Sequence, residues 1–85
     1  MNSSKDIKEQ TKLIFALEEA IESQKANLKS EDPFYGQKNV NINGFDISVE
    51  VDEYSNNLAR IKASHNNFKL EVIEENHEKK RLYPN

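Results

Sequence analysis

Apolar and polar residues alternate on both sides of the pair Asn43-Gly44. Asn-Gly favours a two-residue type I′ hairpin turn, because both of its residues tolerate a positive φ. Each flanking run carries its apolar side chains at every second position: Val40, Ile42, Phe45, Ile47, Val49 and Val51. The pattern predicts two antiparallel strands, over about 38–42 and 45–52, that share one apolar face.

A second hairpin is predicted at Asn66-Asn67, because Asn also tolerates the left-handed backbone. Its strands would span about 58–64 and 68–74. Placing Val49 opposite Ile61 gathers the apolar residues of all four strands on one face. The same register sets Glu50 opposite Arg60 on the other face, and such a cross-strand pair of opposite charges is favourable. The sequence therefore predicts a four-stranded antiparallel meander with one dry face and one wet face.

A long helix is predicted before the sheet. Between Asp6 and about Lys29 the chain has neither Gly nor Pro. Apolar residues recur there at helical spacing: Ile7, Leu13, Ile14, Leu17, Ala20, Ile21 and Leu28. The helix should cover about 5–30, because a residue before proline, here Asp32, disfavours helical geometry. We expect this apolar stripe to contact the sheet.

The predicted helix is longer than the predicted strands. Twenty-four helical residues span about 36 Å, whereas seven strand residues span about 23 Å. One end of the helix should therefore extend past the sheet. The fold class is α+β, a long N-terminal helix packed on one face of a four-stranded antiparallel β-meander. It forms a single domain over 1–74, followed by a charged C-terminal tail, 75–85.

The composition of the chain excludes several kinds of site. The chain has 85 residues, no cysteine and a net charge of −3. It therefore offers no disulfide and no thiolate ligand. No stretch is long and apolar enough for a membrane span, so we expect a cytoplasmic protein that does not use a membrane as partner.

Candidate catalytic and cofactor-binding residues are missing from the sequence. His65 is predicted on the core face as a structural group, and His77 lies in the tail. Ser48 and Ser64 have no histidine within predictable reach. Both glycines are assigned to turns, so neither builds a phosphate loop. We expect a protein that is not an enzyme and that uses no metal and no cofactor.

Three aromatic residues are candidate contacts for a protein partner. Phe15 falls on the charged side of the helix, and Phe34 and Tyr35 lie in a turn-rich connection, 32–36. Exposed aromatics are common interface anchors. In the alternatives, Phe15 is an ordinary surface residue and the loop aromatics close the end of the core. The length of the helix also favours a homodimer through the N-terminal helix.

Nucleic-acid binding is an alternative function that would use the polar sheet face and the basic tail. Its candidate residues are Arg60, Lys62, Lys79, Lys80 and Arg81. Carboxylates share the sheet face, and no aromatic is expected there for base stacking, since Tyr54 is assigned to a loop. Nucleic acid is therefore possible as a partner but not favoured.

The hairpin segment 41–47, Asn-Ile-Asn-Gly-Phe-Asp-Ile, resembles a strand–turn–strand of small accessory proteins from Gram-positive phages and mobile elements. The likeness covers about a tenth of the chain and includes no functional residue. It implies a bacterial or phage origin, with which the frequent Asn, Lys and Ile codons agree. The leading hypothesis is a small non-catalytic protein-binding accessory factor that inhibits a host or rival protein. A structural subunit of a larger assembly is a further alternative.

Overall fold

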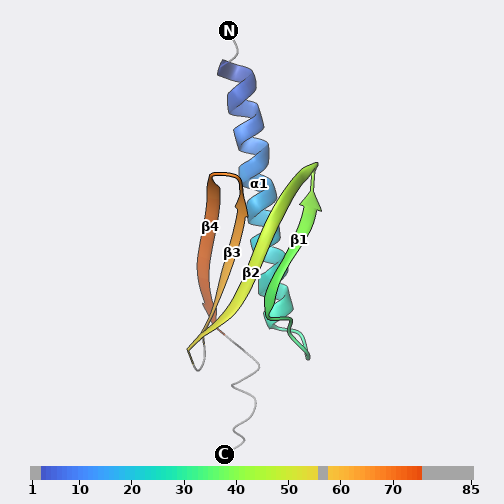
Figure 1. The fold of residues 1–85 in the computed structure, drawn as a ribbon, viewed down its shortest axis with the longest axis vertical. Coiled ribbons are helices and arrows are strands. Elements are labelled where there is room, and N and C mark those ends of the chain that lie inside the picture. The colour runs from blue at the N-terminus through green and yellow to red at the C-terminus, as the bar shows by residue number, and fades with distance from the viewer. Residues whose placement is uncertain (1–2, 56–57, 76–85) are drawn as a thin grey trace, which may run out of the picture.

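A single helix lies across one face of a four-stranded antiparallel sheet (Figure 1). The computed structural model describes residues 3–55 and 58–75, with side chains from Ile7 onward. Its elements in chain order are α1 (Ser3–Leu28), β1 (Gly36–Ile42), β2 (Phe45–Ser55), β3 (Leu58–His65) and β4 (Phe68–Glu75). The strands pair in the order β1-β2-β3-β4. The predicted fold class, an α+β meander covered by a helix, is confirmed.

Both predicted hairpin turns are present. Asn43 and Asn66 each have φ of 54°, and Gly44 has φ of 90°. These left-handed conformations are the ones that Asn and Gly adopt most readily. The residues that close the two loops pair directly, Ile42 with Phe45 and His65 with Phe68. The predicted registers of β1 on β2 and of β3 on β4 are therefore correct.

The register between β2 and β3 differs from the predicted one by two residues. Val49 lies opposite Ala63, and the partner of Ile61 is Val51. The predicted pairing of Val49 with Ile61 is therefore wrong. A shift by two residues leaves every side chain on its original face, so the apolar pattern does not distinguish the two registers.

The shift also changes the charge pairs on the wet face. Arg60 faces Asp52 instead of Glu50, and Lys62 takes the place opposite Glu50. An irregularity between Glu53 and Ser55 accompanies this change, and it extends β2 three residues beyond the predicted end. Tyr54, assigned to a loop from the sequence, belongs to β2.

The core lies between α1 and the inner face of the sheet. The strands contribute Ile47, Val49, Val51, Ala59, Ile61 and Ala63, each no more than 1% exposed. The helix contributes Leu13, Ala16, Leu17, Ala20, Ile21 and Leu28. Alternation along β2 and β3 thus separates a dry face from a wet one, as predicted.

The N-terminal end of α1 extends past the sheet, as its length predicts (Figure 1). Every residue from 7 to 12 is exposed, and Leu13 has the first buried side chain. The expectation that the whole stripe contacts the sheet is therefore wrong for Ile7 and Ile14, which are 61% and 41% exposed. Ile7 precedes the first buried residue of the helix, Leu13, whereas Ile14 lies at the side of the helix, next to the buried stripe.

His65 lies on the inner side of the sheet beside the second turn, where the sequence predicts it. Its Nδ1–H donates to the carbonyl of Asp46 at 2.7 Å. Its ring meets Phe45 edge-on, with 5.5 Å between ring centroids. Phe68, which pairs with His65 at the same end of the sheet, is 39% exposed.

The division between the two faces can be tested by a matched pair of substitutions. Ile61→Ala removes a fully buried side chain and should lower the free energy of unfolding by about 2–5 kcal/mol. Ile73→Ala removes the same atoms from a side chain that is 45% exposed, and its cost should be below about 1.5 kcal/mol. Urea denaturation measures both. Equal losses would contradict the assignment of faces.

Gln24 is a polar residue within the buried stripe of α1. Its side chain is 5% exposed, and its Oε1 has no hydrogen-bond partner among the described residues. A buried acceptor without a partner costs about 1–3 kcal/mol. Gln24→Leu should therefore raise the free energy of unfolding by about 1 kcal/mol, measured by urea denaturation. Gln10→Leu, on the exposed extension of the same helix, is the control and should change stability little. A loss of stability in Gln24→Leu would show that the amide is satisfied.

Candidate protein-binding surfaces

The exposed end of α1 carries a group of apolar side chains, here named the helix-extension patch: Ile7, Ile14 and Phe15. Ile7 and Phe15 are each 61% exposed and Ile14 is 41% exposed. At about 100° per residue the three fall within an arc of roughly 100°, on the side and back of the helix relative to the sheet. Thr11, within the same arc, donates its hydroxyl to the carbonyl of Ile7 at 2.9 Å. The patch is thus apolar and contributes no side chain to the core.

The Phe34-Tyr35 connection lies at the other end of α1 and is held by Asn27. The Asn27 amide nitrogen donates to the Phe34 carbonyl at 2.9 Å, and the Phe34 N–H donates to the Asn27 side-chain oxygen at 2.8 Å. Lys38 places its Nζ 4.9 Å from the centroid of the Phe34 ring, within the range of a cation–π contact. Phe34 and Tyr35 remain 37% and 36% exposed. They neither belong to the core cluster nor project freely.

The three predicted partner-binding residues do not form one surface. Phe15 precedes Asn27 by twelve helical positions, which corresponds to about 18 Å along the axis. Phe34 is bonded to Asn27. Phe15 and the loop aromatics therefore occupy separate regions of the molecule. The Asn27 contact has no local sequence signature, because it joins two segments through space.

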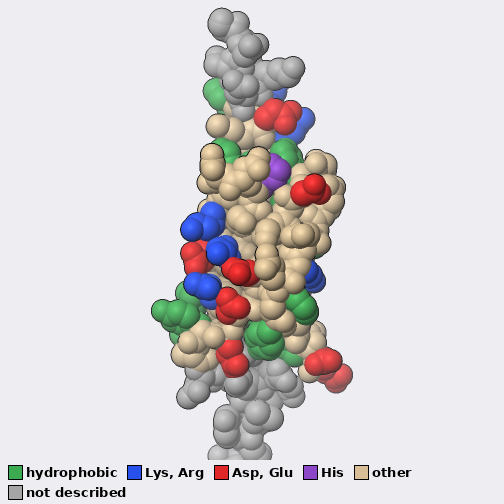
Figure 2. Space-filling model, in the orientation of Figure 1, with side chains coloured by type: hydrophobic (Ala, Val, Ile, Leu, Met, Phe, Trp, Pro, Cys, Tyr) green, Lys and Arg blue, Asp and Glu red, His purple; other side chains and the backbone are tan. Residues whose placement is uncertain are grey.

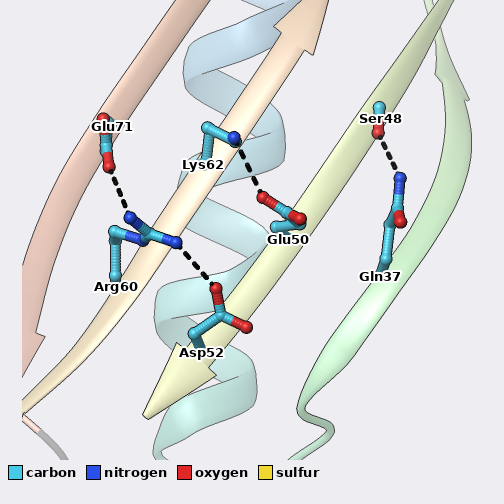
Figure 3. A network of polar contacts seen from close by, with 7 residues as sticks. All are labelled: Gln37, Ser48, Glu50, Asp52, Arg60, Lys62 and Glu71. Carbon is cyan, nitrogen blue, oxygen red and sulfur yellow. Dashed lines mark hydrogen bonds and ion pairs between the residues drawn. The ribbon is translucent and has the colours of Figure 1, made fainter. Parts of the chain in front are cut away.

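The outer face of the sheet is crossed by ion pairs between neighbouring strands (Figure 3). Arg60 on β3 contacts Asp52 on β2 at 2.9 Å and Glu71 on β4 at 3.4 Å. The hydrogen bond with Asp52 raises the pKa of the Arg60 guanidinium. Lys62 lies 3.0 Å from Glu50, as an ion pair without hydrogen-bond alignment. The two sheet cations of the predicted nucleic-acid surface, Arg60 and Lys62, therefore both contact carboxylates.

Positive and negative side chains intermingle on this outer face (Figure 2). Its described strand positions carry three cations and five carboxylates: Arg60, Lys62, Lys69, Asp46, Glu50, Asp52, Glu71 and Glu75. Lys79, Lys80 and Arg81 lie outside the described residues, as does His77. Phosphate binding requires an excess of positive charge, and the described face has none.

A groove of about 360 Å³ runs between α1 and β4. We name it the α1–β4 groove. Apolar and charged residues line it: Glu18, Ile21, Glu22, Lys25, Leu70, Glu71 and Val72. Lys25 spans one end, 3.0 Å from Glu22 and 3.6 Å from Glu74. The hydrogen bond with Glu22 raises the pKa of Lys25. The sequence predicts β4 as an edge strand but does not reveal the groove, which depends on where the helix crosses the sheet.

Within the described residues, no group of three or more His, Cys, Asp or Glu side chains could hold a metal ion. No helix in the same part of the chain is long and apolar enough to cross a membrane. No protein-family model, curated protein or solved structure matches this chain.

The anchoring of the Phe34 loop gives a direct test. Asn27→Ala removes both side-chain hydrogen bonds to Phe34 and should lower the free energy of unfolding by about 1–2 kcal/mol. Asn39→Ala alters another exposed asparagine, on β1, and should cost less than about 0.5 kcal/mol. Thermal unfolding of the two variants measures the difference. Equal stability would mean that the loop does not depend on Asn27.

Proposed function

We propose that this protein is a small non-catalytic protein-binding accessory factor and that its helix-extension patch is the contact surface. The observation that supports this proposal is the joint exposure of Ile7, Ile14 and Phe15 in the N-terminal half of α1, outside the buried stripe that faces the sheet. A large exposed aromatic side chain such as Phe15 is a common hot spot of protein interfaces.

The extension has no evident role in stabilising the fold. Residues 7–12 contribute no buried side chain, and a short helical segment without tertiary packing is only marginally stable in water. Insertion of an amphipathic helix into an apolar groove of another protein would bury the patch. Such partners contact side chains at positions i, i+7 and neighbouring sites, which is the spacing of Ile7, Ile14 and Phe15.

A different protein is favoured over a second copy at this patch. A coiled-coil seam needs apolar residues at two positions of each heptad over three or four heptads. The patch offers three apolar side chains, and Gln10 lies on the same part of the helix. The homodimer through the N-terminal helix stays a prediction, as do the phage or mobile-element origin and the inhibitory role.

The nucleic-acid alternative receives no support from the described residues. Arg60 and Lys62 are engaged by Asp52, Glu71 and Glu50, so phosphate contacts would have to replace existing ion pairs. The carboxylates next to Arg60 and Lys62 would also repel the phosphates of a nucleic acid.

The proposal is tested by partner capture together with stability. Phe15→Ala should reduce partner recovery from the native host at least tenfold, because the large aromatic contact of the patch is lost. The same substitution should change the free energy of unfolding by less than about 1 kcal/mol, because the side chain is 61% exposed. Quantitative mass spectrometry of the captured proteins and urea denaturation give the two readouts.

Tyr54→Ala is the matched control, since Tyr54 is 65% exposed but lies on β2. It should recover the same proteins as the wild type. Unchanged recovery with Phe15→Ala would contradict the proposal. A large loss of stability in that variant would show instead that Phe15 supports the fold.

A further inference from the structure

Among the described strands, none occupies the outer edge of β4. In a two-residue hairpin the residues that flank the loop, here His65 and Phe68, form a hydrogen-bonded pair. Hydrogen-bonded positions then alternate along the strand, so Leu70 also directs its backbone groups to β3. The intervening residues, Lys69 and Glu71 among them, direct their N–H and C=O groups outward. No described strand pairs with these groups, because β4 is last in the sheet.

This edge has few of the features that prevent strand addition. β4 has eight residues, contains no proline and pairs with β3 without a bulge. Beside it lies the α1–β4 groove, with the apolar side chains of Ile21, Leu70 and Val72. A strand added at this edge would lengthen the sheet and extend side chains toward the groove.

The sequence of β4 is complementary to itself when the strand is read in both directions. The five residues 68–72 are Phe-Lys-Leu-Glu-Val. In an antiparallel pair centred on Leu70, Lys69 of each copy lies opposite Glu71 of the other. The two Leu70 residues face each other, and Phe68 lies opposite Val72. Charged residues thus meet opposite charges on the wet face, and apolar residues meet on the dry face.

We propose that β4 pairs with β4 of a second copy of this chain, antiparallel and centred on Leu70. The two sheets would then join into one eight-stranded sheet with a twofold axis perpendicular to it. Lys69 and Glu71 would form two symmetric ion pairs and two hydrogen-bonded backbone pairs. Phe68, now 39% exposed, and the half-buried Leu70 and Val72 would be covered.

Neighbouring registers are less favourable. Centring the pair on Glu71 would set the Glu71 carboxylates of the two copies opposite each other. Centring it on Lys69 would set the two Lys69 ammonium groups opposite each other. Centring it on Val72 would set Leu70 opposite Glu74. Directly opposed like charges destabilise a strand pair. The charge pattern therefore specifies both the register and the second copy as the occupant.

The other edge of the sheet lacks such a pattern. By the same alternation, β1 directs outward the backbone groups of Gln37, Asn39 and Asn41. These side chains are neutral, so they select neither a partner nor a register by charge. The pairing through β4 also keeps both helices on the same side of the joined sheet. It leaves Phe15 uncovered, because that residue lies on the side of α1 away from the sheet.

The test is a charge exchange followed by light scattering over a range of concentrations. The wild type should be a dimer. In a Lys69→Glu dimer, the new carboxylate at position 69 of each copy would face Glu71 of the other copy. In a Glu71→Lys dimer, the new ammonium group at position 71 of each copy would face Lys69 of the other copy. Each variant alone should therefore dimerise at least tenfold more weakly than the wild type. An equimolar mixture should recover the dimer, because each chain then presents only the charge that the other needs.

Two further variants make the result decisive. Lys29→Glu makes the same charge change at an exposed residue after α1 and should keep the dimer. Lys69→Pro removes an outward N–H without breaking a bond to β3, and should give a folded monomer. Glu71→Lys loses its contact with Arg60 and could fail to fold for that reason. In that case Lys69→Pro still tests whether the two copies pair through β4.

A monomeric wild type at millimolar concentration would overturn the proposal. It would also be overturned if Lys69→Glu and Lys69→Pro remained dimers while Phe15→Ala became monomeric, since the copies would then meet through the helix. The proposed capture of another protein by the helix-extension patch would be unaffected by a monomeric wild type. The two proposals therefore fail through different measurements.

Discussion

One-sided burial of the sheet determines the rest of this structure. Along β2 and β3 every inward position from Ile47 to Val51 and from Ala59 to Ala63 is apolar and buried beneath α1. Because successive strand residues point to opposite faces, this assignment also decides which residues reach water. Arg60, Lys62 and their carboxylate partners are outside for that reason. The candidate surfaces are therefore consequences of the core.

The mismatch between a 26-residue helix and a smaller sheet creates the second main feature. The core accounts for α1 only from Leu13 to Leu28, and the preceding segment continues into solvent with Ile7 exposed. The helix also covers β4 incompletely, which leaves the α1–β4 groove beside an open strand edge. The helix-extension patch thus follows from the length of the helix, and the α1–β4 groove follows from its narrow width relative to the sheet.

The sequence predicts the features that local chemistry determines. Asn43-Gly44 and Asn66-Asn67 set two of the three strand registers, because a two-residue loop leaves no freedom in the pairing. The third register differs from the predicted one by two residues. The charges do not distinguish the two registers, because Glu50 lies opposite a cation in both, Arg60 in the predicted one and Lys62 in the structure. The Asn27–Phe34 contact, the unsatisfied oxygen of Gln24 and the groove arise from packing through space, which local patterns do not encode.

The register of β2 on β3 is the most direct test of this account, because it positions every outer ion pair and the free edge. Antiparallel residues that are not hydrogen-bonded to each other bring their α-protons close together. Nuclear Overhauser spectroscopy should therefore detect α-proton contacts between Val51 and Ile61 and between Val49 and Ala63. A strong α-proton contact between Val49 and Ile61, with the other two missing, would contradict the account.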